Sequence, residues 1–221
     1  MREAVGGIVV FWDDKVLELV GMEVGVYSIS YRFKNYDDGF VWIFTGVYGP
    51  TLGGVREDFW ADLGAIRGLW NDLSCIGGDF TVVRFLGERF GANTRLCATM
   101  RRFTKVIEDL QLRGLSLLGG SFTWRKGLNN QAHARLDRFL VSDGWEGHFS
   151  GVILCLLTKL VSDHSVILFF FFFLVGEGGG RGLQFRFENM WLKEERFKDL
   201  AKSWWMNINF RGSPSFILVE K

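Results

Sequence analysis

The sequence predicts an α/β domain in which two packed, mixed β-sheets are flanked by helices. Three observations support this fold class. Short apolar runs rich in β-branched and aromatic residues recur along the chain, two segments with helical spacing separate some of them, and several runs are joined closely enough to form hairpins. Strands are expected at 7–12, 24–33, 41–48, 75–80, 122–124, 135–141, 151–157 and 166–174.

The helices are expected at 56–73 and 100–110. In the first, apolar residues such as Phe59, Leu63 and Ile66 recur at intervals of three and four. In the second, Phe103, Val106, Ile107 and Leu110 do the same. That spacing places each set on one face of a helix, where it packs against a sheet.

Length and composition indicate a folded domain with no marked charge. The chain has 221 residues, of which 48% are hydrophobic. This excludes the disordered class, which combines low hydrophobicity with high net charge. A net charge of +1 gives no support to nucleic-acid binding by the chain as a whole, so only local basic patches could provide it.

Cysteine and targeting patterns point to a reducing compartment. The three cysteines match neither a zinc pattern nor a closed disulfide framework. No signal peptide is visible, so we expect a nuclear or cytoplasmic protein. The Phe-rich run at 165–175 is about half the roughly 20 residues that cross a bilayer. We interpret it as a strand and expect no membrane partner.

A Gly-rich stretch at 176–182 divides the chain. We expect the main domain at 1–176. Residues 177–221 are expected to form a flexible break followed by a charged connector with a helix at 188–205.

Three short polar segments carry an Asp at or near the end of an apolar run. They contain Asp79, Asp137 and the pair Asp163–His164. Carboxylates at strand ends can converge on Mg²⁺, which takes one or two of them together with water and substrate phosphate. A His adds a group that moves protons near neutral pH. The set therefore fits metal-assisted phosphodiester hydrolysis.

Each segment also has a simpler interpretation. An Asp after Gly-Gly is a turn former or helix cap about twice as often as it is a site residue. Asp137 lies between Arg135 and Arg138 and could be a salt-bridged strand residue. Asp163 and His164 could belong to an ordinary loop. Taken singly, each segment favours the simpler interpretation, and their joint order favours the site.

That order resembles the endonuclease/exonuclease/phosphatase superfamily, and most closely the endonuclease domains of plant LINE-type (non-LTR) retrotransposons. The stretches that carry the resemblance are FTGVYGP (44–50), AIRGLWND (65–72), CIGGDF (75–80), FTW (122–124), RLDRFLVS (135–142) and VSDHSVIL (161–168). FRFENMWL (185–192) resembles the connector to a reverse transcriptase domain that this chain lacks. The resemblance implies a four-layer, DNase I-like sandwich without its first strands, a Mg²⁺ or Mn²⁺ cofactor, and DNA as the partner.

The resemblance also implies catalytic roles. Asp79 would orient or deprotonate the attacking water, and Asp137 would orient the site and act in leaving-group or metal chemistry. Asp163 would pair with His164 and contact the metal, and His164 would stabilise the charge that grows on phosphorus. Tyr48, Thr81 and Thr123 would position the scissile phosphate.

Two departures from the family pattern predict impairment. The Asn-bearing first strand and the strand with the principal metal-binding Glu have no counterpart in this sequence. In addition, Thr81 stands where the family has Asn. A hydroxyl cannot present the donor–acceptor pair of an amide, and losing one such preorganised group costs about 10² to 10³ in rate.

The sequence leaves three functions open. The first is a relic of a DNA-nicking endonuclease. The second is a non-catalytic remnant that binds nucleic acid or protein, through the basic residues Arg84, Arg89, Arg95, Arg101, Arg102, Arg125, Lys126, Arg135 and Arg138. The third is a small-molecule phosphatase of the same superfamily, against which the LINE-like stretches and the connector argue.

Overall fold

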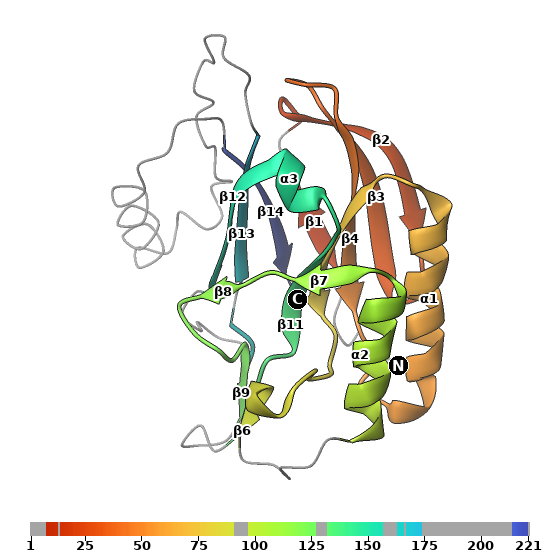
Figure 1. Ribbon diagram of the computed structural model, residues 1–221, viewed down its shortest axis with the longest axis vertical. Coiled ribbons are helices and arrows are strands. Elements are labelled where there is room, and N and C mark those ends of the chain that lie inside the picture. Colours follow the sequence, from red (N-terminus) through yellow and green to blue (C-terminus); the bar gives the residue numbers. More distant parts are fainter. Residues whose placement is uncertain are drawn as a thin grey trace, which may run out of the picture.

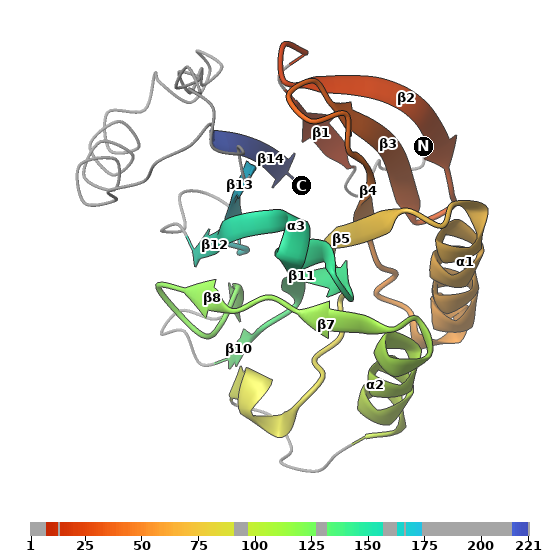
Figure 2. The same cartoon turned by 45° about the horizontal axis from the view of Figure 1, so that its top comes forward.

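The computed structural model describes residues 8–12, 14–90, 97–126, 132–156, 163–165, 167–173 and 214–220. Within them two β-sheets pack face to face, and two helices cover the outer face of one sheet (Figures 1 and 2). Both sheets are mixed, since each combines antiparallel pairs with one parallel pair. The predicted fold class is therefore confirmed.

The larger sheet has six strands. They are β2 (Leu17–Val24), β3 (Ser28–Asn35), β4 (Val41–Tyr48), β5 (Leu73–Asp79), β11 (Asp137–Ser142) and β7 (Leu112–Gly114), in that spatial order. β4 and β5 run parallel because helix α1 (Arg56–Leu69) makes the crossover between them. α1 and α2 (Ala98–Asp109) bury Phe59, Trp60 and Phe103 against this sheet.

The second sheet has the order β1 (Val9–Phe11), β14 (Pro214–Glu220), β13 (Ile167–Phe173), β12 (Phe149–Leu156), β8 (Leu117–Leu118). β14 pairs with β13 on one side and with β1 on the other. Residues 214–220 thus lie within this sheet, whereas the sequence pattern placed them in a connector. The predicted helix at 188–205 lies outside the described residues.

The core between the two sheets is aromatic. It includes the fully buried side chains of Phe33, Trp42, Phe44, Trp145 and Phe169. Because side chains alternate along a strand, β11 sends Phe139 into this core and Leu140 toward the helices. The same alternation decides which face each site residue points to.

Smaller elements complete the described part of the chain. Three short strands, β6 (Arg89–Phe90), β10 (Ala132–Ala134) and β9 (Trp124–Lys126), form a separate sheet. The 3₁₀ helices η1 (Gly53–Val55) and η2 (Leu86–Glu88) and the short helix α3 (Trp145–His148) occupy connections. No helix among the described residues is long and apolar enough to span a membrane.

Candidate active site

Three candidate residues form a row at one end of the larger sheet. Tyr48 ends β4 and is paired with Asp79, which ends β5. Asp79 is paired in turn with Asp137, which begins β11. By strand alternation, Asp79 shares a face with Cys75, and Asp137 shares one with Phe139, both of which lie in the core between the sheets. The row therefore faces the gap between the two sheets, where the aromatic core ends.

His164 reaches this row from the other sheet. It lies three residues before β13 and forms an isolated β-bridge with Trp124. The backbone on either side is held by Arg125 N–H donating to the Asp163 carbonyl at 2.9 Å and by Ser165 N–H donating to the Thr123 carbonyl at 2.7 Å. These bonds fix the imidazole opposite the two carboxylates.

The resulting cluster is compact. His164 Nδ1 lies 2.8 Å from Asp137 Oδ2, and His164 Nε2 lies 3.9 Å from Asp79 Oδ2. One possible ligand atom from each of the three residues falls within 4.8 Å of the other two. The side chains are 4% exposed for Asp79, 15% for Asp137 and 10% for His164. They are thus largely shielded from bulk water.

Thr123 lies behind Asp137 rather than at the surface. It is completely buried, and its hydroxyl oxygen accepts the backbone N–H groups of Leu136 and Asp137, both at 3.0 Å. Thr123 thereby fixes the start of β11. The contact with substrate phosphate that the sequence predicted stays a prediction.

Asp163 is not part of the cluster. Its side chain is exposed, and Oδ2 accepts a hydrogen bond from Trp124 Nε1 at 2.8 Å. The carboxylate paired with His164 is that of Asp137. The sequence predicted that Asp163 would hold a metal and pair with His164. The structure brings Asp79, Asp137 and His164 together, and the metal-binding role of Asp163 stays a prediction.

Thr81 adopts an unusual backbone conformation, with φ of 54°. Its N–H donates to Asp79 Oδ1 at 2.7 Å, so Asp79 forms the turn that the simpler interpretation expected and also faces His164. The Thr81 hydroxyl oxygen lies 2.8 Å from the Pro50 carbonyl and 2.8 Å from the Phe80 carbonyl, and its single proton can be donated to either. The hydroxyl is therefore engaged by backbone carbonyls.

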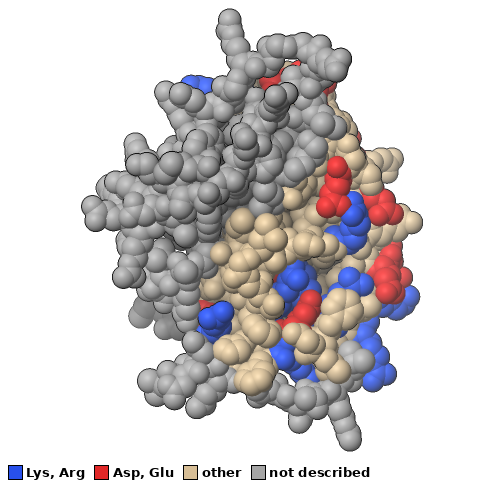
Figure 3. Space-filling model, turned by 60° about the vertical axis from the view of Figure 1, so that its left-hand side comes forward, with Lys and Arg blue, Asp and Glu red and all other residues tan. Residues whose placement is uncertain are grey.

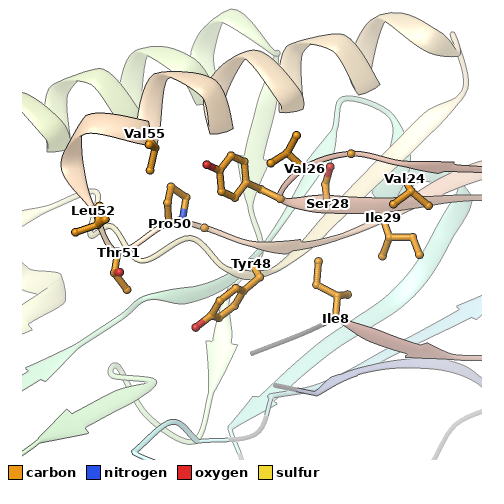
Figure 4. Close-up of a pocket in the computed structure, with 13 residues that line it drawn as sticks. Ile8, Val24, Val26, Ser28, Ile29, Tyr48, Pro50, Thr51, Leu52 and Val55 are labelled. Carbon is orange, nitrogen blue, oxygen red and sulfur yellow. The ribbon is translucent and has the colours of Figure 1, made fainter. Parts of the chain in front are cut away.

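Tyr48 lines a pocket beside this row. The pocket has a volume of about 560 Å³, and its walls include Ile8, Val24, Val26 and Leu52. Figure 4 shows the Tyr48 ring on the side of its strand that faces away from α1. Val26 and Leu52 are 81% and 72% exposed, so the pocket has an open apolar rim.

Among the basic residues in the middle of the sequence that the structure describes, several are paired with acids or buried. Arg102 pairs with Glu57 between the two helices, and Arg84 reaches Glu108. Arg138 is buried. On the described part of the face in Figure 3, acidic side chains lie among the basic ones. This mixture favours a solvated charged surface over a track for a phosphate backbone, which needs concentrated positive charge.

Sequence reasoning missed a buried ion pair next to the site. Arg138 and Glu88 are 5% and 13% exposed and make two hydrogen bonds, at 2.9 and 3.0 Å. Burial raises the pKa of Glu88, but the bonds and charge of Arg138 and two backbone N–H groups outweigh burial and lower it overall. The two residues are far apart in the sequence and no motif links them, so only the fold reveals the pair.

Comparisons with solved structures agree with this architecture. The endonuclease domain of TRAS1, a telomere-specific non-LTR retrotransposon, superposes with a TM-score of 0.55 and 12% identity, over 76% of this chain and 79% of that one. A 3′-5′ exonuclease from Neisseria meningitidis gives a TM-score of 0.51 and 13% identity, over 73% and 78%. The fold is DNase I-like. No protein-family model and no curated protein sequence matches the chain.

Proposed function

We propose that this chain is a divalent-metal-dependent, DNA-nicking endonuclease domain of LINE-type retrotransposon descent, with weakened phosphodiester hydrolysis. The convergence of Asp79, Asp137 and His164 carries the proposal. The shared fold with a retrotransposon endonuclease domain and a 3′-5′ exonuclease supports it. In such a site, rate comes mainly from positioning and charge neutralisation.

The contacts of each side chain in the cluster indicate its role. Because Asp137 is hydrogen-bonded to His164 Nδ1, that nitrogen carries the proton, and Nε2 is aimed at the side where Asp79 lies. When the ring is protonated, Nε2–H can donate to a phosphate oxygen as negative charge accumulates there. Asp79, on the other side of the gap, is placed to orient the attacking water and accept its proton.

The cluster fits a small hard cation. Two carboxylates facing one gap match the one or two that Mg²⁺ or Mn²⁺ takes, with water and phosphate oxygens completing the coordination. Asp79 and Asp137 would hold the ion, while His164 is engaged by Asp137. When bound, the cation neutralises charge on the phosphate and acidifies water.

One feature supports weakened hydrolysis. Thr81 stands where the family has Asn, and its single hydroxyl faces the Pro50 and Phe80 carbonyls, both at 2.8 Å, so it does not present the donor–acceptor pair of an amide. We also propose DNA as the partner and a nuclear or cytoplasmic location, as the sequence predicts.

Relaxation of supercoiled plasmid in Mg²⁺ or Mn²⁺ tests the proposal. We expect slow nicking that EDTA abolishes and that Asp137→Asn or His164→Ala reduces by at least about 10². His148→Ala is the matched control, because His148 also pairs with an aspartate, Asp38 at 3.0 Å, beyond the opposite end of β11. It should leave nicking unchanged.

Other outcomes would select the alternatives. Salt-dependent DNA binding without any cleavage would replace the proposal with a non-catalytic binding remnant. Release of phosphate from inositol phosphates, lost in Asp137→Asn, would replace it with a phosphatase. Nicking that persists in Asp137→Asn and His164→Ala would show that another part of the chain cuts DNA.

A further inference from the structure

Arg138 is a buried cation directly behind the candidate site. It follows Asp137 in β11 and points to the opposite face, where its guanidinium lies 5.2 Å from the centre of the Phe103 ring. It donates to both carboxylate oxygens of Glu88, to the Val82 carbonyl at 3.2 Å and to the Arg135 carbonyl at 2.6 Å. One side chain thus holds two separate points of the backbone and the side chain of Glu88.

Glu88 gathers a second set of groups. Its Oε2 accepts the backbone N–H of Arg84 at 2.5 Å and of Phe85 at 3.2 Å, and its own carbonyl accepts Arg135 N–H at 2.8 Å. Because the pKa of Glu88 is lowered in spite of burial, the side chain is ionised at neutral pH. The segment that follows Asp79 is therefore tied to the segment around Asp137 by a charged, hydrogen-bonded pair.

The position of this pair links it to the catalytic cluster. Asp79 and Asp137 form the last rung of the β5–β11 ladder, and one further backbone bond, from the Phe80 N–H to the Leu136 carbonyl at 3.1 Å, joins the two segments beyond it. We propose that Glu88 and Arg138 are positioning residues, a clamp that fixes the separation of the Asp79 and Asp137 carboxylates and so sets the site's affinity for a divalent cation. This inference rests on the proposed function.

Stability alone does not explain the pair. Well-packed apolar residues can replace a buried ion pair at little cost to the folded state. They cannot supply the directed bonds from Arg138 to the Val82 and Arg135 carbonyls. Those bonds act on the backbone close to the Asp79–Asp137 rung, where small shifts move the carboxylates. Outer groups that orient metal ligands are typically worth about 10- to 100-fold in affinity or activity.

The test uses double replacements in the full chain. Glu88→Met with Arg138→Met removes the clamp but fills the space. Glu57→Met with Arg102→Met is the matched control, because it removes an exposed Arg–Glu pair between the two helices. Thermal melting checks folding, Mn²⁺ alone is titrated by EPR, and NMR follows the His164 Nδ1 proton that is bonded to Asp137.

We expect Mn²⁺ affinity to fall about 10- to 100-fold in the clamp variant, with a shifted His164 signal and no change in the control. Arg138→Lys keeps the buried charge and loses the two-pronged contact with Glu88, so it should lower Mn²⁺ affinity by less than the double variant does. If the double variant fails to fold, Arg138→Lys is compared with the wild-type chain instead.

Wild-type Mn²⁺ affinity together with an unchanged His164 signal in a folded clamp variant would overturn the clamp. A wild-type chain that binds no Mn²⁺, but whose His164 signal still depends on Glu88 and Arg138, would overturn the proposed function and the role in cation affinity, and would support only the positioning of the cluster by the clamp. The two failures are thereby distinguishable.

Discussion

Replacing Thr81 with Asn should make the protein both more stable and more active. A left-handed backbone costs a residue with a Cβ about 1–2 kcal/mol, and a β-branched side chain such as Thr tolerates it poorly. Thr81 has φ of 54°. Asn visits this region with less strain because its short polar side chain can bond locally.

The change has one opposing contribution. The Thr81 hydroxyl oxygen lies 2.8 Å from both the Pro50 and the Phe80 carbonyl, and the one bond that it donates is worth about 1 kcal/mol. The amide NH₂ of Asn can donate to the Pro50 carbonyl in its place, so we expect a net gain of about 1 kcal/mol. For a chain of this length that corresponds to a rise in Tm of about 2–4 °C.

Calorimetry and plasmid nicking measure the two effects. Gln111→Asn is the matched control, because Gln111 also has a positive φ, 52°, and lies at the start of β7 rather than in the site. Both variants should melt higher, and only Thr81→Asn should nick faster, by about 10² or more. An unchanged or lower Tm for Thr81→Asn would refute the strain argument. Equal activity in both variants would refute the role of the amide.

Three further predictions follow from described contacts. Gly78→Ala should lower the free energy of unfolding by about 3 kcal/mol or more, because a Cβ at this position would collide with the Val47 carbonyl. Its φ of 141° is also unfavourable for alanine, and soluble expression and thermal melting measure the loss of stability. Because the folded-state pKa of Glu88 is lowered, its stabilising contribution should be complete above its ordinary pKa near 4.5 and lost as pH falls through the lowered value. Urea unfolding from pH 7 to 3 should show this loss and a flatter profile in Glu88→Gln. Asp137→Asn should shift the NMR signal of the His164 Nδ1 proton, because that proton loses its carboxylate acceptor; an unaltered signal would contradict the pairing.

Much of the secondary structure could be predicted from local pattern. The helix expected at 100–110 is α2, Ala98–Asp109, and the strand expected at 41–48 is β4. The run at 24–33 was predicted as one strand and is instead the end of β2, a turn and β3. The turn depends on Asp62 of α1, whose carboxylate accepts the Tyr27 N–H and the Ser28 hydroxyl. Because this turn depends on a contact between distant segments, no local sequence pattern predicts it.

The meeting of Asp79 and Asp137 could be predicted, because each lies at one end of a strand. Asp79 and Asp137 meet because β5 and β11 are neighbours, and their polar ends interrupt apolar runs that the sequence displays. The partner of His164 was not predictable, because the family resemblance implied Asp163, while the fold brings Asp137 to His164 and the Asp163 carboxylate to Trp124. The burial of Thr123 was not predictable either, because its hydroxyl accepts a backbone N–H of β11 that only the fold brings close.

The place of β14 in its sheet governs when the fold can form. The Val9–Glu220 rung joins residues about two hundred positions apart, and the length-dependent entropy of closing such a loop is about 5 kcal/mol. During synthesis, β1 and β13 must wait for residues 214–220 before either gains this neighbour. Until then β13 presents a bare edge whose sequence, Ile-Leu followed by five Phe, invites pairing with other chains. We therefore expect the chain to fold slowly, and to aggregate if residues 214–220 are not yet in place.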